Sequence, residues 1–119
     1  MANLLIVDDA MFMRAALKKT IESVGHTVVA EASTGVEAIE QYRLLHPDMV
    51  LMDITMPDMD GITATSKIRE VDPNATIIMV SALGQMEMVV KAITAGAKDF
   101  IVKPVDDEKL KACVHKYLS

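Results

Sequence analysis

The stretch LLIVDD, residues 4–9, joins four apolar residues to two aspartates close to the start of the chain. A short apolar run of this kind is typical of a β-strand that is buried on both faces of a sheet. Similar runs recur at residues 27–30, 49–52 and 77–80, and a shorter one lies at 100–102. The sequence therefore predicts five short strands.

The segments between and after these runs repeat their apolar residues every three or four positions, which is typical of amphipathic helices. Thr34 and Asp106 are suited to begin two of these helices, and Gly25 and Gly96 to end two others. Met88 lies outside the inward stripe of its helix. We expect five helices, whose inward residues are Met13, Leu17, Ile21 and Val24; Ala38, Tyr42 and Leu45; Ala64, Ile68 and Val71; Met86, Val89, Val90 and Ile93; and Leu110, Val114 and Tyr117.

The strict alternation of strands and helices predicts the α/β class, in which right-handed crossovers cover both faces of a parallel sheet. Five strands are too few for an eight-stranded barrel. We predict a five-stranded, doubly wound parallel sheet with the flavodoxin-like strand order 2-1-3-4-5 and five helices. The length of 119 residues fits a single domain that spans residues 1–119.

Composition and charge exclude several classes of protein. The formal net charge of −5 opposes binding to phosphate backbones, so we expect no nucleic acid partner. Cys113 is the only cysteine, so no internal disulfide can form, which fits a reducing cytoplasm. No apolar run exceeds four residues, and acids interrupt the N-terminal stretch, so we expect neither membrane insertion nor a signal peptide. The expected location is cytoplasmic.

Polar residues follow four of the predicted strands: Asp8 and Asp9, then Asp53, Ser81 and Lys103. Ligands of open parallel sheets bind beyond the carboxyl ends of the strands, so we expect these five side chains at one edge. Three clustered carboxylates repel one another and favour a bound divalent cation. Oxygen ligands without a histidine or thiol nearby in the sequence indicate Mg²⁺ rather than zinc.

In the predicted strand order, Asp53 lies between the two acids that follow the first strand and the hydrogen-bond donors Ser81 and Lys103. A carboxylate beside Mg²⁺, with an ammonium and a hydroxyl on its other side, is suited to accept a phosphoryl group as an acyl phosphate. Asp53 is the expected nucleophile. Lys103 would neutralise charge on the transferring oxygens together with the metal, and Ser81 would donate a hydrogen bond to one of them.

Four motifs at strand ends carry a resemblance to a known family. They are LIVDD at 5–9, MDITMP at 52–57 with Gly61, VSA at 80–82 and FIVKP at 100–104. In this order they resemble the receiver domain of bacterial two-component response regulators, over the whole chain. Residues 9–14 and 95–100 are similar in particular to the single-domain chemotaxis regulators of this family.

The resemblance implies a role for each site residue. Asp53 is implied as the phosphorylation site, with a histidine kinase as phosphodonor. Asp8, Asp9 and Asp53 are implied as ligands of Mg²⁺, with the backbone carbonyl of Thr55 as a further ligand. Lys103 is implied to contact the phosphoryl oxygens, and its bond to the following proline is often cis in the family.

The resemblance also implies a switch made by Ser81 and Phe100. In receivers the hydroxyl moves toward the phosphoryl group, and the aromatic ring rotates inward into the space that it leaves. Phe100 stands where the best-known chemotaxis members carry tyrosine, and Ser81 where they carry threonine. Leu83 is an apolar residue at a place that influences access to the site.

The implied function is a phosphoryl-accepting signalling switch in chemotaxis that controls flagellar rotation. The chain is not expected to be an enzyme, apart from its own phosphorylation and the hydrolysis of its own phosphoryl group. We expect a monomer that binds a chemotaxis-type histidine kinase and, downstream, a flagellar switch protein or a phosphatase. The chain ends soon after the fifth helix, so we expect output through another protein that contacts the fourth helix, the fifth strand and the fifth helix.

Alternative functions share the fold or the chemistry. A phosphorelay intermediate and a phosphate sink would use the same site with other partners. A haloacid-dehalogenase-like phosphatase also uses a nucleophilic aspartate with Mg²⁺, but it needs a second acid two residues later, where this chain has Thr55. An FMN carrier needs aromatic walls and a phosphate loop, whereas this chain has two tyrosines, two phenylalanines and no tryptophan.

Overall fold

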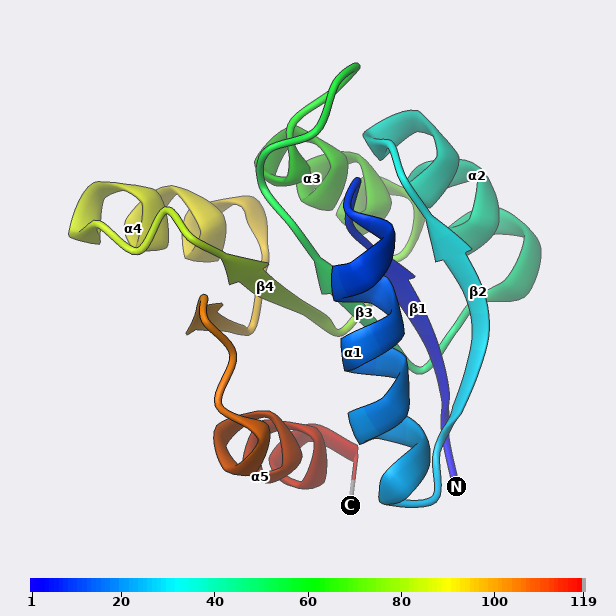
Figure 1. Cartoon of the computed structure of the whole chain (residues 1–119). Helices are drawn as coiled ribbons and strands as arrows, with labels where there is room; N and C mark the ends of the chain where they lie inside the picture. The colour runs from blue at the N-terminus through cyan, green and yellow to red at the C-terminus, as the bar shows by residue number, and fades with distance from the viewer. Residues whose placement is uncertain (119) are drawn as a thin grey trace.

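The computed structural model describes residues 1–118 and contains one sheet of parallel strands in the order β2-β1-β3-β4-β5. Strands and helices alternate along the chain, and helices lie on both sides of the sheet (Figure 1). The predicted class, strand order and number of helices are confirmed. The strands are β1 (Asn3–Val7), β2 (Thr27–Ala32), β3 (Met49–Met52), β4 (Ile77–Ser81) and β5 (Asp99–Val102). The helices are α1 (Met11–Ser23), α2 (Gly35–Leu45), α3 (Gly61–Val71), α4 (Met86–Ala95) and α5 (Asp107–Leu118).

Burial differs between the central strands and the edge strands. Every residue of β3 and β4 is buried, as the apolar runs predict. The same prediction is wrong for β2, whose residues alternate between exposed and partly buried until Ala32, and for β5, where only Ile101 is buried and Val102 is exposed. The reason is the place of these strands at the edges of the sheet, where β2 pairs only with β1 and β5 only with β4. β2 also continues two residues beyond the predicted end at Ala30.

Successive strand residues point to opposite faces of the sheet and build two separate apolar layers. One layer joins residues of β1, β3 and β4 to Ala38 and Tyr42 of α2, to α3 and to Ala92 of α4. The other joins the alternate residues of those strands to α1 and α5. The sheet is therefore covered by α2, α3 and α4 on one face and by α1 and α5 on the other (Figure 1).

Four predicted helix boundaries are confirmed by local geometry. Gly25 and Gly96 follow α1 and α4 with φ values of +89° and +119°, a left-handed conformation that favours glycine. The Thr34 hydroxyl accepts a hydrogen bond from the backbone N–H of Glu37 at the start of α2 (3.1 Å). The Asp106 carboxylate accepts one from the N–H of Glu108 at the start of α5 (2.9 Å).

Tyr42 joins α2 to the end of α3 through a hydrogen bond. Its side chain is buried as predicted, and its hydroxyl donates to Asp72 Oδ2 (2.7 Å). Burial, followed by the hydrogen bond to Asp72, raises the pKa of Tyr42 far above its ordinary value. The same hydrogen bond lowers the pKa of Asp72. Leu45 and Val24, in contrast, are exposed rather than inward, because each lies at or beyond the last turn of its helix.

The predicted inward face of α4 is wrong. Met86, Val90 and Ile93 are 75%, 55% and 46% exposed. The buried residue of this helix is Ala92, and Met88 packs against the core beside it. α4 therefore presents three large apolar side chains to the surface, and it packs on the core through Ala92 and Met88.

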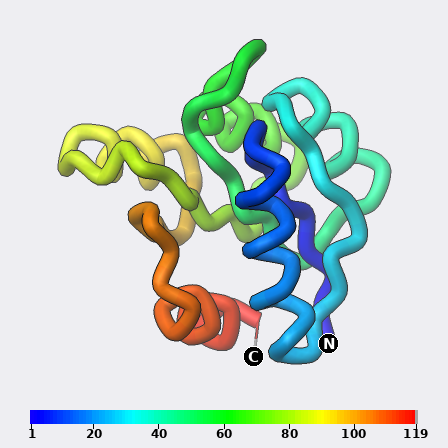
Figure 2. The backbone as a smooth tube through the Cα atoms, in the orientation of Figure 1, coloured from blue at the N-terminus to red at the C-terminus, as the bar shows by residue number. Residues whose placement is uncertain are grey.

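The loops that follow β1 and β3 lie at the opposite end of the molecule from the start of β1 and the end of α5 (Figure 2). In this view the loops are at the upper end, and the start of β1 and the end of α5 are at the lower end. In residues 1–118, none of the helices has the length and apolar character needed to cross a membrane.

Candidate functional site

Three carboxylates meet beyond the carboxyl ends of β1 and β3. Asp8 and Asp9 follow β1, Asp53 follows β3, and the two strands are neighbours whose last residues, Val7 and Met52, lie side by side. One carboxylate oxygen from each aspartate lies within 4.8 Å of those of the other two. The structure therefore brings together the three acids that the sequence places at this edge.

Asp8 is buried and held by hydrogen bonds on both its backbone and its side chain. Its N–H donates to the carbonyl of Ala32 (3.0 Å), which continues the pairing of β1 with β2. Its Oδ1 accepts from the N–H of Ala10 (2.9 Å) and its Oδ2 from Lys103 Nζ (2.7 Å). Both carboxylate oxygens of a residue that is only 1% exposed thus have a partner.

Lys103 brings a positive charge to this site from the end of β5. Its Nζ lies 3.6 Å from Asp53 Oδ1, in addition to the shorter contact with Asp8. Its own N–H donates to the carbonyl of Ser81 (2.9 Å), and the peptide bond to Pro104 is cis. The ammonium group therefore lies between two carboxylates.

Asp53 is buried, at 5% exposure, and its electrostatic surroundings are mixed. Burial, followed by the charge of Asp8, raises the pKa of Asp53, while Lys103 and the N–H of Ile54 act in the opposite direction. A raised pKa means that negative charge here is only partly compensated by the protein. A bound divalent cation would complete the compensation, so these three carboxylates fit Mg²⁺ in both donor type and charge.

Ser81 and Phe100, the predicted switch residues, lie on adjacent strands: Ser81 ends β4, and Phe100 is the second residue of β5, paired with Met79. Ser81 is buried, and its hydroxyl oxygen accepts a hydrogen bond from the N–H of Leu83 (3.1 Å). Phe100 is partly buried and packs against the apolar layer that α2, α3 and α4 cover. Thr55 is exposed in the loop after Asp53.

The loop after β3 is fastened at points that sequence reasoning missed. The N–H of Gly61 donates to the carbonyl of Ile54 (2.7 Å), and a Cβ on Gly61 would lie only 1.8 Å from the carbonyl oxygen of Asp53. Asp58 accepts hydrogen bonds from the N–H groups of Gly35 and Val36 at the start of α2. Gly61 appears in the family motif, but the pattern gives no sign of the Asp58 contact.

The contact of Arg14 with the site was also missed. Its Nη1 donates to the backbone carbonyl of Asp8 (2.7 Å), and its Nε donates to Glu31 Oε1 (3.0 Å). Only the position of Arg14, at the start of a helix that follows the two acids, could have suggested this contact.

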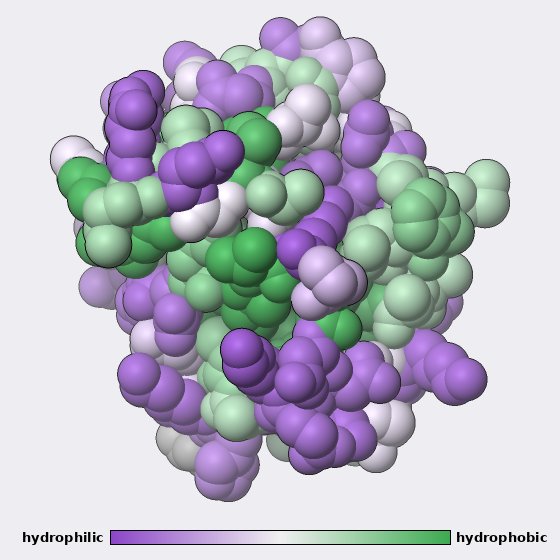
Figure 3. Space-filling model, turned by 60° about the vertical axis from the view of Figure 1, so that its left-hand side comes forward, coloured by the Kyte–Doolittle hydropathy of each residue, from purple (hydrophilic) through white to green (hydrophobic). Residues whose placement is uncertain are grey.

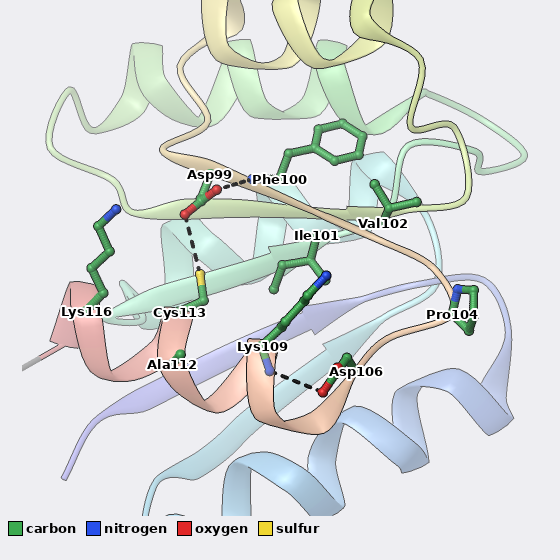
Figure 4. A pocket seen from close by; sticks show the side chains of 10 residues that line it. All are labelled: Asp99, Phe100, Ile101, Val102, Pro104, Asp106, Lys109, Ala112, Cys113 and Lys116. Atoms are coloured by element: carbon green, nitrogen blue, oxygen red, sulfur yellow. Dashed lines mark hydrogen bonds between the residues drawn. The ribbon is translucent and has the colours of Figure 1, made fainter.

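An apolar surface lies between α4 and α5. Figure 3 shows apolar side chains over α4 and in the space below it, bordered by the polar residues of α5. Met86, Val90 and Ile93 of α4 and Val102 of β5 are exposed apolar residues, and Val90 also lines a groove between α3 and α4. A pocket between β5 and α5 adjoins this surface, and Figure 4 shows Ile101 pointing into it while Phe100 and Val102 point to the other side of β5.

Comparison with known sequences identifies close relatives. Residues 4–115 match the model of the response regulator receiver domain. The chain is 53% identical over 117 residues to the chemotaxis protein CheY of Bacillus subtilis, with 98% of each chain covered. It is 54% identical over 114 residues to the chemotaxis protein CheY of Thermotoga maritima, with 96% of this chain and 95% of that protein covered.

Comparison with solved structures agrees with the fold. The crystal structure of the CheX–CheY–BeF3–Mg²⁺ complex from Borrelia burgdorferi matches with a TM-score of 0.93 at 42% sequence identity. The match covers 98% of this chain and 90% of that chain. CheY is itself a standard example of the strand order 2-1-3-4-5.

Proposed function

The chain belongs to the response regulator receiver domain family, and from this premise we propose that it is a phosphoryl-accepting switch of a chemotaxis two-component system. The observation that carries the proposal is the position of Asp53, a buried carboxylate with two further acids and one ammonium around it. In this proposal Asp53 accepts the phosphoryl group of a phosphohistidine on a chemotaxis-type kinase. Apart from its own phosphorylation and the hydrolysis of its own phosphoryl group, the chain would not act as an enzyme.

The transfer is a displacement at phosphorus. An Oδ atom of Asp53 forms a bond to phosphorus while the bond from phosphorus to the imidazole nitrogen breaks, and the imidazole leaves with the electron pair. Lys103 favours the ionised, nucleophilic form of Asp53 and neutralises charge on the phosphoryl oxygens.

Asp8, Asp9 and Asp53, with the backbone carbonyl of Thr55, would hold Mg²⁺. The ion would supply further neutralisation of the phosphoryl oxygens. Its fit is supported by the three clustered carboxylates and by the raised pKa of Asp53. The structure solved with a CheY protein and Mg²⁺ agrees with this proposal for a relative.

The phosphoryl group would then be read by Ser81 and Phe100. The Ser81 hydroxyl, whose oxygen now accepts a hydrogen bond from the N–H of Leu83, would turn to donate a hydrogen bond to a phosphoryl oxygen. Phe100 lies on the adjacent edge strand and is only partly buried, so space around its ring can change. A group that interacts differently with two states shifts the population between them.

Output would pass through the surface formed by α4, β5 and α5. Its exposed Met86 side chain can adapt to a partner, since methionine is unbranched and flexible, and the exposed valines add apolar contact area. The proposed partners are a flagellar switch protein and a phosphatase, and the chain would act as a cytoplasmic monomer. A phosphorelay intermediate or a phosphate sink would keep the site and differ only in the protein that it binds.

The direct test is phosphorylation by acetyl phosphate in the presence of Mg²⁺. We expect an acid-stable, base-labile adduct on Asp53, detected by mass spectrometry, and none after the substitution Asp53→Asn. An unchanged adduct in this variant would contradict the assignment. A pull-down with and without beryllofluoride would then identify the output partner and separate chemotaxis from a relay or sink.

A further inference from the structure

Arg14 lies beside the carboxylates but makes no contact with their oxygens. It projects from α1, and its guanidinium joins two neighbouring segments: Nη1 donates to the backbone carbonyl of Asp8 (2.7 Å), and Nε to Glu31 of β2 (3.0 Å). The Arg14 side chain is only 16% exposed. The planar guanidinium can make both bonds at once because its donors lie in a fixed fork.

The carbonyl of Asp8 belongs to the same rigid peptide plane as the N–H of Asp9. The hydrogen bond from Arg14 therefore fixes the orientation of the peptide plane that precedes the Cα atom of Asp9. The Asp8 carboxylate is already held by Ala10 and Lys103, so it does not depend on Arg14 alone. The Asp9 side chain is exposed and, within residues 1–118, has no side-chain hydrogen bond or ion pair that would orient it.

We propose that Arg14 is a positioning residue for the metal site, because it holds the Asp8–Asp9 peptide so that the Asp9 carboxylate faces Asp8 and Asp53. The inference rests on the Mg²⁺ site of the proposed function. Groups that orient metal ligands from outside the ligand set commonly change metal affinity by about 10-fold to 100-fold when they are substituted. Arg14 has this geometry toward Asp9.

The charge of Arg14 and its hydrogen bond to the Asp8 carbonyl should have opposite effects on the affinity for Mg²⁺. A guanidinium near a cation site repels the cation, so removal of the charge alone would strengthen Mg²⁺ binding. Loss of the hydrogen bond to the Asp8 carbonyl should weaken Mg²⁺ binding. The sign of the change in affinity therefore separates positioning from electrostatics, and Arg14→Lys isolates geometry because the charge is retained.

The chain offers a matched control in Arg69. This residue of α3 also donates from Nη1 to a backbone carbonyl, that of Gly96 after α4 (2.8 Å), but it takes no part in the carboxylate site. Arg69→Ala thus removes an equivalent structural hydrogen bond. A loss of general stability would affect both variants, whereas a loss of metal positioning would affect only Arg14.

The experiment is a calorimetric titration of the unphosphorylated protein with Mg²⁺. We expect the dissociation constant to rise about 10-fold or more in Arg14→Ala and to rise by a smaller factor in Arg14→Lys. In Arg69→Ala it should stay within about twofold of the parent value, since the two sites share no partner. Urea unfolding of each variant without Mg²⁺ verifies that it is folded. If Arg14→Ala does not fold, the Mg²⁺ titration of Arg14→Lys tests the inference by itself.

Equal or tighter Mg²⁺ binding in a folded Arg14 variant would overturn the inference. An equal rise in the dissociation constant for Arg69→Ala would also overturn it, because the effect would then be one of stability. Absence of Mg²⁺ binding in the parent protein would refute the proposed metal site itself. If the metal site exists but Arg14 does not position it, the parent and Arg14→Lys will bind Mg²⁺ with the same dissociation constant.

Discussion

Lys103 and Asp8, 95 residues apart in the chain, form a partly buried ion pair in which Nζ lies 2.7 Å from Oδ2. The ammonium group is thus closer to Asp8 than to Asp53, at 3.6 Å. Lys103 therefore compensates the charge of a predicted metal ligand as well as that of the predicted nucleophile. Its removal should affect stability and metal binding together.

Lys103→Met should lower the free energy of unfolding by about 3 kcal/mol without Mg²⁺, because it leaves Asp8 buried without its charged partner. Mg²⁺ should stabilise this variant more than the parent, since it can replace the missing positive charge. Urea unfolding with chelator and with Mg²⁺ measures both effects. A variant whose stability Mg²⁺ does not raise would contradict the role of Lys103 as a compensating charge.

Mg²⁺ should raise the melting temperature of the parent protein. At a concentration of about ten times the dissociation constant, mass action adds about 1.4 kcal/mol, which corresponds to a shift of about 5 °C for a chain of this size. Asp9→Ala should abolish the shift, because it removes one of the three carboxylates. Identical melting curves with chelator and with millimolar Mg²⁺ would refute the metal site.

Gly61→Ala should destabilise the protein by more than about 3 kcal/mol and slow phosphorylation, since the new methyl group would collide with the carbonyl of Asp53. Gly25→Ala is the matched control. Gly25 has a φ of +89° but open space around its missing Cβ, so its loss should cost about 1 kcal/mol and leave phosphorylation unchanged. Urea unfolding and the rate of acetyl phosphate labelling distinguish the two variants.

Ser81→Ala and Phe100→Ala should each reduce the phosphorylation-dependent gain in partner affinity by about fivefold or more, while Asp53 is still labelled. Affinity for the partner retained in the pull-down is measured with and without beryllofluoride. If Phe100 were only a core residue, its truncation would cost about 3–5 kcal/mol of stability and leave the gain unchanged. An equal gain in both variants and the parent would exclude these residues as the switch.

The contribution of Tyr42 to stability should depend on pH in the acidic range. The hydrogen bond lowers the pKa of Asp72 in the folded state, so the unfolded state takes up this proton first as the pH falls. The stabilisation is therefore full above the ordinary aspartate pKa of about 3.9 and is lost as the pH falls through the lower folded value. Tyr42→Phe should lower the urea midpoint at pH 7 and by less at pH 3. The pH dependence of this difference should vanish in an Asp72→Asn background.

The fold could be predicted because each central strand is a continuous apolar run with polar residues at its end. Residues 49–52 illustrate this, since burial of a short strand on both faces allows no other pattern. The edge strand β2 has a similar run but lies half in solvent, and the sequence carries no mark of its edge position. The order of strands came from the fold class rather than from the runs themselves.

The face of α4 could not be predicted from its pattern. Helical spacing places Met86, Val89, Val90 and Ile93 on one face of α4, yet three of these residues are exposed, so the apolar stripe marks a surface and not the face that packs on the sheet. The buried residue is a small one, Ala92, because the helix packs closely on the layer below. An excess of large apolar residues on an exposed face is typical of a surface that other proteins contact.

The acids of the site could be predicted because strand topology alone brings Asp8, Asp9 and Asp53 together. The contacts that support these acids could not be predicted. A hydrogen bond to a backbone carbonyl, such as that from Arg14 to Asp8, does not depend on a repeating pattern in the sequence. The same holds for the contact of Asp58 with the start of α2.

The start of β1 and the end of α5 both lie at the far end of the molecule from the loops after β1 and β3. A fluorescent protein or an affinity tag joined at the N-terminus would therefore point away from the carboxylates. Immobilisation through such a tag should leave the site open to metal, phosphodonor and beryllofluoride on a sensor surface. The binding experiments above can thus use a tethered chain without obstructing the chemistry that they measure.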